Sequence, residues 1–153
     1  MEHNFGKEAF IPNHALKFFA PLLGDWETIG SHPYLPGLVL HGHTSFKWME
    51  GGAFIIMHSE TNEEGIPSGI AVFGSDDATG EYFMLYFDER NVSRKYNVEF
   101  KDNTMKWWRN SPDFSQRATC TFSADGNSIT SRGEMSRDNQ HWEKDLELQY
   151  TRI

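Results

Sequence analysis

Clusters of turn-forming residues recur at near-regular intervals from Gly24 to the C-terminus, and they separate runs rich in β-branched and aromatic side chains. The clusters lie at residues 33–37, 50–52, 62–65, 76–80, 89–91, 101–103, 110–113, 124–127 and 137–140. No interval is long enough to hold a crossover helix, so the roughly ten strands are expected to pair antiparallel in chain order. Closure into a barrel removes the two exposed edges of such a meander, and it is favoured over a sandwich or a flat sheet.

One short helix is expected before the first strand. Asn13 can cap this helix, and Leu16, Phe19 and Leu23 recur at helical spacing. Pro21 limits it to about two turns. The sequence therefore predicts an all-β protein, a closed antiparallel meander barrel of about ten strands with one short N-terminal helix.

No repeat, low-complexity tract or linker interrupts the chain, so residues 1–153 are expected to form a single domain. Residues 1–13 are polar and irregular, and a loose lead-in is expected there. They contain no apolar segment typical of a signal peptide, and no apolar run approaches the ~18 residues of a membrane span. Cys120 is the single cysteine, so no internal disulfide can form and a cytoplasmic location is expected.

Charge and aromatic content narrow the classes of partner. The formal net charge of −8 argues against nucleic acid and against anionic membranes, because both attract basic surfaces. Aromatic residues make up 14% of the chain, and so much aromatic surface must line a core, a cavity or an interface. The strand over residues 81–88 is apolar on both faces, which predicts a covering helix or a homodimer contact on its outer face.

Two short motifs resemble those of a known superfamily. Gly24-Asp25-Trp26 opens the first strand directly after the short helix, and it resembles the G-x-W signature of lipocalins and their calycin relatives. Arg152 follows Tyr150 at the end of the last strand, where an arginine commonly lies over the signature tryptophan in that superfamily. The resemblance implies a lipocalin-like barrel whose base is closed by Arg152 on Trp26, a cation–π contact of roughly 0.5–2 kcal/mol.

Most of the chain also resembles a bacterial family of uncharacterised lipocalin-like proteins. The resembling stretches are residues 22–26, 46–54, 84–88, 108–109, 114–117 and 123–127. This resemblance implies a fold and no activity. Residues 21–26 are similar to the start of nitrobindin, a ten-stranded barrel that binds heme through a histidine, and the similarity assigns no residue of this chain to that histidine.

Alternation along the predicted strands selects candidate cavity residues, because every second side chain points into a barrel. Tyr82, Met84, Tyr86 and Asp88 share one face of their strand. Two tyrosines and a carboxylate on an inner wall would form a pocket with a few orienting polar groups. In the alternative interpretation, the two hydroxyls simply reach the barrel rim.

The next two strands add further candidates. Arg94 and Tyr96 share a face and can meet an anionic head group, and a surface position for Arg94 fits the sequence equally well. Fatty-acid-binding proteins, which are distant relatives by resemblance, hold a carboxylate with an Arg-x-Tyr pair on their last strand, whereas this pair is mid-chain. Trp107 and Trp108 point to opposite faces, and we assign Trp108 to the cavity wall.

Three histidines are candidates for binding or metal ligation. His58 shares a face with Glu60, and we expect both to point inward, as a hydrogen-bonded cavity histidine beside a carboxylate. His41 and His43 lie two residues apart on one strand face, a spacing that a metal can use. An exposed polar face is the favoured interpretation of that pair, because the sequence fixes no third ligand, and no metal site is predicted.

Catalytic motifs such as G-x-S-x-G, G-x-G-x-x-G and H-E-x-x-H do not occur, and Cys120 is interpreted as a small buried hydrophobe. The first hypothesis is that the cavity binds a small hydrophobic or amphipathic ligand, including an anionic one, oriented by Arg94, Tyr86, Tyr96 or His58. One alternative is an enzyme acting on a small molecule in the same cavity. The other is a heme or metal carrier that uses the histidines, and no cofactor is assigned otherwise.

Overall fold

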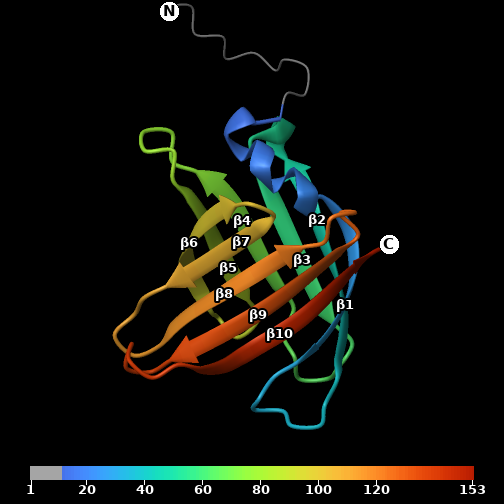
Figure 1. The fold of residues 1–153 in the computed structure, drawn as a ribbon, viewed down its shortest axis with the longest axis vertical. Coiled ribbons are helices and arrows are strands. Elements are labelled where there is room, and N and C mark those ends of the chain that lie inside the picture. The colour runs from blue at the N-terminus through green and yellow to red at the C-terminus, as the bar shows by residue number, and fades with distance from the viewer. Residues whose placement is uncertain (1–11) are drawn as a thin grey trace, which may run out of the picture.

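The computed structural model describes residues 12–153, which form a closed barrel of antiparallel strands (Figure 1). The elements are η1 (His14–Leu22), β1 (Gly24–Ser31), β2 (Leu40–Met49), η2 (Glu50–Gly52), β3 (Phe54–Thr61), β4 (Gly69–Ser75), β5 (Tyr82–Asp88), β6 (Ser93–Lys101), β7 (Thr104–Arg109), β8 (Ser115–Phe122), β9 (Ser128–Ser136) and β10 (Glu143–Arg152). Each strand pairs with the next one in the chain, and β1 pairs with β10, so the meander closes on itself. The predicted fold class is therefore confirmed.

Turn chemistry explains why the chain reverses where the clusters predict. Asp102 and Asn103 have φ of 47° and 49° and form the two-residue connection between β6 and β7. Asparagine and aspartate tolerate this left-handed region, and two successive residues in it give the hairpin turn whose twist matches the flanking strands. The register closes directly on this turn, with Lys101 opposite Thr104.

The predicted helix is a 3-10 helix, η1, which is capped by Asn13. The Asn13 side-chain oxygen accepts a hydrogen bond of 3.0 Å from the backbone N–H of Ala15. The structure buries Leu16, Phe19 and Leu22, whereas Leu23, which was expected on this face, is partly buried. A three-residue spacing aligns side chains along a 3-10 helix, which explains both the helix type and the change of residue. The predicted lead-in over residues 1–13 lies almost entirely outside the described residues.

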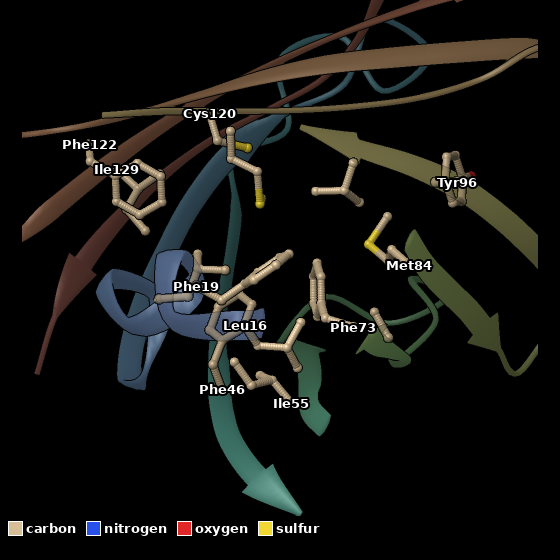
Figure 2. Close-up of a cluster of buried hydrophobic side chains, with 14 of the residues drawn as sticks. Leu16, Phe19, Phe46, Ile55, Phe73, Met84, Tyr96, Cys120, Phe122 and Ile129 are labelled. Carbon is tan, nitrogen blue, oxygen red and sulfur yellow. The ribbon is translucent and has the colours of Figure 1, made fainter. Parts of the chain in front are cut away.

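η1 lies across one end of the barrel and fills it with the side chains of Leu16, Phe19 and Leu22 (Figures 1 and 2). The Phe19 ring centroid is 5.4 Å from that of Phe73, 5.0 Å from that of Tyr82 and 4.9 Å from that of Phe100. Phe19 itself has no exposed surface. These contacts pack this end of the barrel with hydrophobic side chains, and we call it the closed end.

Arg152 lies over Trp26 at the closed end, in the contact expected from the sequence. The guanidinium carbon is 4.1 Å from the Trp26 ring centroid. The same guanidinium donates hydrogen bonds to the carbonyl oxygens of Leu23 at 2.6 Å, Pro21 at 3.0 Å and Gly126 at 3.1 Å. Arg152 thereby ties the last strand to the segment that joins η1 to β1.

The single cysteine of the sequence, Cys120, lies in the barrel interior. Cys120 is buried, and burial raises the pKa of its thiol to about 11, so it is a small core side chain as expected. Within residues 12–153, no helix has the length and apolar character needed to cross a bilayer.

Candidate ligand-binding site at the open end of the barrel

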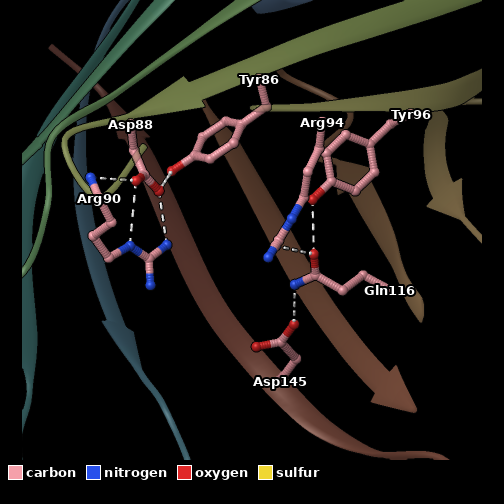
Figure 3. Close-up of polar contacts among 7 residues, drawn as sticks. All are labelled: Tyr86, Asp88, Arg90, Arg94, Tyr96, Gln116 and Asp145. Carbon is pink, nitrogen blue, oxygen red and sulfur yellow. Dashed lines mark hydrogen bonds and ion pairs between the residues drawn. The ribbon is translucent and has the colours of Figure 1, made fainter. Parts of the chain in front are cut away.

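The end opposite η1 gathers most of the polar side chains that point into the barrel. In an antiparallel meander this end collects the last residues of the odd-numbered strands and the first residues of the even-numbered ones. Asp88 ends β5 and Arg109 ends β7, while Arg94, Gln116 and Asp145 lie within the first three residues of β6, β8 and β10. We call this the open end. It brings together residues that are far apart in the sequence (Figure 3).

Tyr86, Asp88 and Arg90 form one polar cluster on β5 and the turn that follows it. The Asp88 carboxylate accepts a 3.0 Å hydrogen bond from the Tyr86 hydroxyl and a 2.7 Å bond from Arg90 Nη2 (Figure 3). The Asp88 side chain has no exposed surface. Hydrogen bonds from Arg90 lower the pKa of Asp88 to about 2, and burial together with the Asp88 carboxylate raises the pKa of Tyr86.

A second cluster is organised by the side-chain amide of Gln116. Its Oε1 accepts a 2.9 Å hydrogen bond from Arg94 Nη1 and a 2.7 Å bond from the Tyr96 hydroxyl. Its Nε2 donates a 2.8 Å bond to Asp145 Oδ2 (Figure 3). Burial raises the pKa of Tyr96, so its hydroxyl remains a donor at neutral pH. The amide therefore joins a guanidinium and a phenol of β6 to a carboxylate of β10.

Asp145 reaches the barrel interior through a β-bulge. The β10–β9 register shifts between Lys144 and Glu147, so two residues of β10 face the single residue Gly133. A Cβ on Gly133 would lie 2.9 Å from the Leu146 carbonyl oxygen and 3.3 Å from Asp145 Cβ. The absence of a side chain at this glycine makes room for the bulge that turns Asp145 inward. A mid-strand glycine is the signal that could have revealed the bulge.

His32 connects this cluster to the loop that follows β1. Its Nε2 is 2.9 Å from Asp145 Oδ1, and its Nδ1 accepts a 3.0 Å hydrogen bond from the backbone N–H of Tyr34. Because Nδ1 accepts a hydrogen bond, the proton of the neutral ring lies on Nε2, which donates a hydrogen bond to Asp145. Both ring nitrogens are thus engaged. Beside them, a cavity of about 300 Å³ opens between residues 32–38 and the start of β10.

Aromatic and apolar side chains line the barrel between the two ends. The Tyr96 and Trp107 rings meet edge to face with centroids 4.9 Å apart, and Met84 is buried opposite Tyr96 in the register. Tyr86 and Trp107 point inward and pack on the core, yet both are only half-buried. Both side chains are therefore accessible to solvent in part.

The structure brings most of the predicted cavity residues together. Tyr82, Met84, Tyr86 and Asp88 share the inner face of β5, and Arg94 and Tyr96 share that of β6. Tyr82 lies nearest the closed end, against Phe19. Four inward residues of the open end are not among the predicted cavity residues: His32, Arg109, Gln116 and Asp145.

The predicted inward orientation is wrong for His58 and Glu60. Ser45 on the outer face of β2 is opposite His58, while the buried side chain of β3 is Ile55. The inward residues are therefore the odd-numbered ones, and the prediction was out of register by one residue. His58 and Glu60 instead form an exposed pair with Nδ1 3.3 Å from Oε1.

The assignment of Trp108 to the cavity wall is also wrong. Trp107 is opposite Val98, which is buried in the core, so Trp107 takes the inner position. Trp108 is opposite Asn97 and Arg117, which are both exposed, and therefore lies on the outer face. Because the two tryptophans are consecutive, the alternation of polar and apolar residues could not distinguish the inner face of the strand from the outer one.

His41 and His43 lie on the outer wall, as the favoured interpretation has it. His41 Nδ1 is 3.2 Å from a Glu63 carboxylate oxygen, and His43 Nε2 is 3.4 Å from an Asp25 oxygen. Among residues 12–153, no group of three or more His, Cys, Asp or Glu side chains is arranged to hold a metal ion. The histidines are instead paired one by one with carboxylates.

Comparisons with known proteins identify the fold and no family. No protein-family model matches the sequence, and no curated protein matches it significantly. Among solved structures, the chain is similar to Rv2717c from M. tuberculosis, with a TM-score of 0.67 and 12% identity over 94% of this chain and 99% of that one. It is also similar to the S-type phycobiliprotein lyase CPES from Guillardia theta, with a TM-score of 0.55 and 10% identity over 90% and 91%. At these identities the likeness shows the fold alone, a closed antiparallel β-barrel.

Proposed function

We propose that the protein binds a small hydrophobic or amphipathic molecule through the open end of the barrel. The apolar part of the ligand would lie against Trp107, Tyr96 and Met84, and its polar part would meet the groups around Gln116. The observation that carries this proposal is the contrast between the two ends. One end is filled by the side chains of η1, whereas inward aromatic and polar side chains remain half-exposed at the other.

The chemistry of the lining supports this function over its alternatives. A wall of aromatic side chains with a few fixed polar groups is the usual composition of a small-molecule site. One structural neighbour is a phycobiliprotein lyase, which is compatible with an enzyme built on this fold. A heme or metal carrier using His41, His43 or His58 would hold its cofactor on the outer wall, so it is not part of the proposal. The proposal includes a cytoplasmic location, which rests on the unpaired, buried Cys120.

Native mass spectrometry of the purified protein, together with its visible absorption spectrum, is the first experiment. A co-purified small molecule without a Soret band would support the proposal, and its mass would begin to identify the ligand. A stoichiometric heme or metal ion would overturn it.

A titration with N-phenyl-1-naphthylamine, an uncharged fluorescent hydrophobe, tests the location. W107A is expected to weaken its binding about fivefold to tenfold, because large buried aromatics dominate binding energies. W108A, a matched change on the outer face of the same strand, is expected to stay within twofold of the wild type. Equal effects of the two variants would contradict binding inside the barrel.

A further inference from the structure

We infer that the polar part of the ligand is an oxyanion, a carboxylate, sulfonate or phosphate group, held between Arg94 and Arg109. This inference rests on the proposed function and specifies the ligand class at the same site. It also adds Arg109, which sequence reasoning did not select.

The two arginines give the inner wall of the open end a net positive charge. Arg90 already neutralises Asp88, and both carboxylate oxygens of Asp145 are engaged, one by His32 and one by Gln116. Arg94 uses one nitrogen, on the neutral amide oxygen of Gln116.

Arg109 forms no ion pair and no side-chain hydrogen bond with any residue of the range 12–153. The chain as a whole has a net charge of −8, yet this interior surface has two positive charges and one unneutralised negative charge. The local excess of positive charge favours a negatively charged ligand.

Both arginines are neighbours of the same residue, Gln116. Arg94 is bonded to the Gln116 amide, and Arg109 is directly opposite Gln116 in the β7–β8 register. Arg109 is on the inner face, because it alternates with Met105 and Trp107. The Arg94 guanidinium carbon is 5.4 Å from the Phe114 ring centroid, which limits its movement.

Guanidinium donors match the geometry of carboxylate and phosphate oxygens, and their hydrogen bonds to anions are roughly twice as strong as neutral ones. The single O–H of Tyr96 is already donated to Gln116, so the donors for the anion come from the two arginines. A cationic head group at the same place would meet two arginines and is excluded by like-charge repulsion. The ligand class is therefore an amphiphile whose apolar part enters the barrel and whose anionic group stops between the arginines.

A matched pair of probes tests the charge separately from the apolar contact. 1-Anilinonaphthalene-8-sulfonate and N-phenyl-1-naphthylamine share one ring system, and only the first has a sulfonate. We expect R94Q and R109Q each to lower the ratio of the sulfonate's affinity to the amine's affinity about tenfold. R117Q removes an arginine from the outer face, where Arg117 pairs with Glu134, and it is expected to leave both affinities within twofold.

The outcomes separate this inference from the proposed function. If R94Q and R109Q change the ratio no more than R117Q does, the oxyanion site is overturned, while the W107A result still decides whether the barrel binds apolar molecules. Octanoate and octyl phosphate are expected to displace the sulfonate probe, and their relative potency distinguishes carboxylate from phosphate. Equal displacement by inorganic phosphate would support the anion site and contradict an amphipathic ligand.

A second surface supports an independent proposal. The outer faces of β3, β4 and β5 form a continuous apolar patch, because their registers align apolar residues in rows. Ile56, Val72 and Leu85 form the central row, and Ile70 and Phe87 form the next row toward the open end. Ile70 is 39% exposed and Phe87 is 44% exposed, so this patch faces solvent in the isolated chain.

Charged residues surround this patch in a self-complementary pattern. Lys47 and Lys95 are opposite the two ends of the central row, on β2 and β6. Glu60 and Glu81 lie beyond the patch along the strand direction, one toward each end of the barrel. Basic residues therefore flank the patch sideways and acidic residues flank it lengthwise.

We propose that this patch binds the same patch on a second copy of the chain, with the strands of the two sheets crossed at about 90°. Rotation by a right angle places the lysines of one copy over the glutamates of the other, whereas a parallel arrangement would oppose like charges. Orthogonal crossing is one of the two regular ways in which β-sheets pack face to face.

Sedimentation equilibrium of the full chain tests the dimer. We expect the wild type to dimerise and V72E, at the centre of the patch, to be a folded monomer. T119E, on the outer face of β8, is expected to remain dimeric. K47E/K95E should weaken the dimer at least tenfold, and addition of E60K/E81K should restore it. A wild type that stays monomeric at high concentration, or a charge exchange that restores nothing, would overturn the proposal.

Discussion

At the residue scale, Gln116 is important because both the oxygen and the nitrogen of its side-chain amide form hydrogen bonds. The oxygen accepts from Arg94 and Tyr96, and the nitrogen donates to Asp145. A buried polar network of this kind stabilises a fold only while every member has a partner. No described side-chain N or O atom that is buried lacks a hydrogen-bond partner, so removal of this one amide would create several such atoms.

Q116L is therefore expected to destabilise the protein by about 1–3 kcal/mol, because it leaves the partly buried polar groups around Gln116 without their hydrogen-bond partners. Urea unfolding followed by tryptophan fluorescence measures this difference. Q149L is the matched control, since Gln149 is exposed and accepts one hydrogen bond from Thr130 on the outer wall. The control is expected to change stability by less than about 0.5 kcal/mol. Similar losses in the two variants would show that the network adds nothing special.

Asp88 predicts a specific dependence of stability on pH. Its pKa falls from 3.8 to about 2 on folding, because Arg90 donates hydrogen bonds to its carboxylate. A lowered pKa in the folded state gives stability that is complete above the unfolded value and is lost as the pH falls toward 2. Thermal unfolding between pH 5 and pH 2 should therefore show a smaller loss for D88N than for the wild type. An identical loss would contradict the assigned pKa, and D77N in an exposed turn is the control.

At the scale of the elements, the sequence predicts where strands begin and end better than which way their side chains point. Turn residues mark the nine connections between strands because their backbone requirements are local. The inner face follows from alternation only where one face is clearly polar, as in β6, where the exposed Lys95 and Asn97 alternate with the buried Tyr96 and Val98.

β3 and β7 show where such inference stops. Phe54, Ile55, Ile56 and Met57 are all apolar, so either face could be buried, and the register with β2 decides. Trp107 and Trp108 pose the same problem in β7. The bulge that turns Asp145 inward is indicated in the sequence only by the mid-strand Gly133, and its exact position depends on contacts between β9 and β10.

The 3-10 helix η1 offers a test at this scale. F19A is expected to destabilise the protein by about 3–5 kcal/mol, because Phe19 fills the closed end and contacts three aromatic rings. F18A changes the neighbouring residue, which is 55% exposed, and should cost less than about 1 kcal/mol. Urea unfolding of the two variants measures the difference. Equal effects would mean that η1 does not close the barrel.

At the scale of the whole molecule, the barrel divides stability and binding between its two ends. The closed end contains η1, the aromatic cluster around Phe19 and the Arg152–Trp26 contact, which together join the first and last strands. The open end contains half-exposed aromatic side chains and polar groups under long loops. Sites that exchange ligands are drawn from the less stable parts of a fold, so the two ends should differ in local stability.

Hydrogen–deuterium exchange measures that difference along the whole chain. Amides of β1, β2 and β10 near η1 are expected to exchange slowest, and those of loops 32–39, 89–92 and 110–114 fastest, because few buried contacts hold these loops. A saturating amount of N-phenyl-1-naphthylamine should slow exchange at the open end and leave the closed end unchanged. Protection that appears at η1 instead would place ligand entry at the opposite end of the barrel, whereas protection confined to the outer face of β3–β5 would place the probe on the dimer surface. Exchange therefore tests the direction of entry, which neither the affinity of the probe nor its dependence on Trp107 can establish alone.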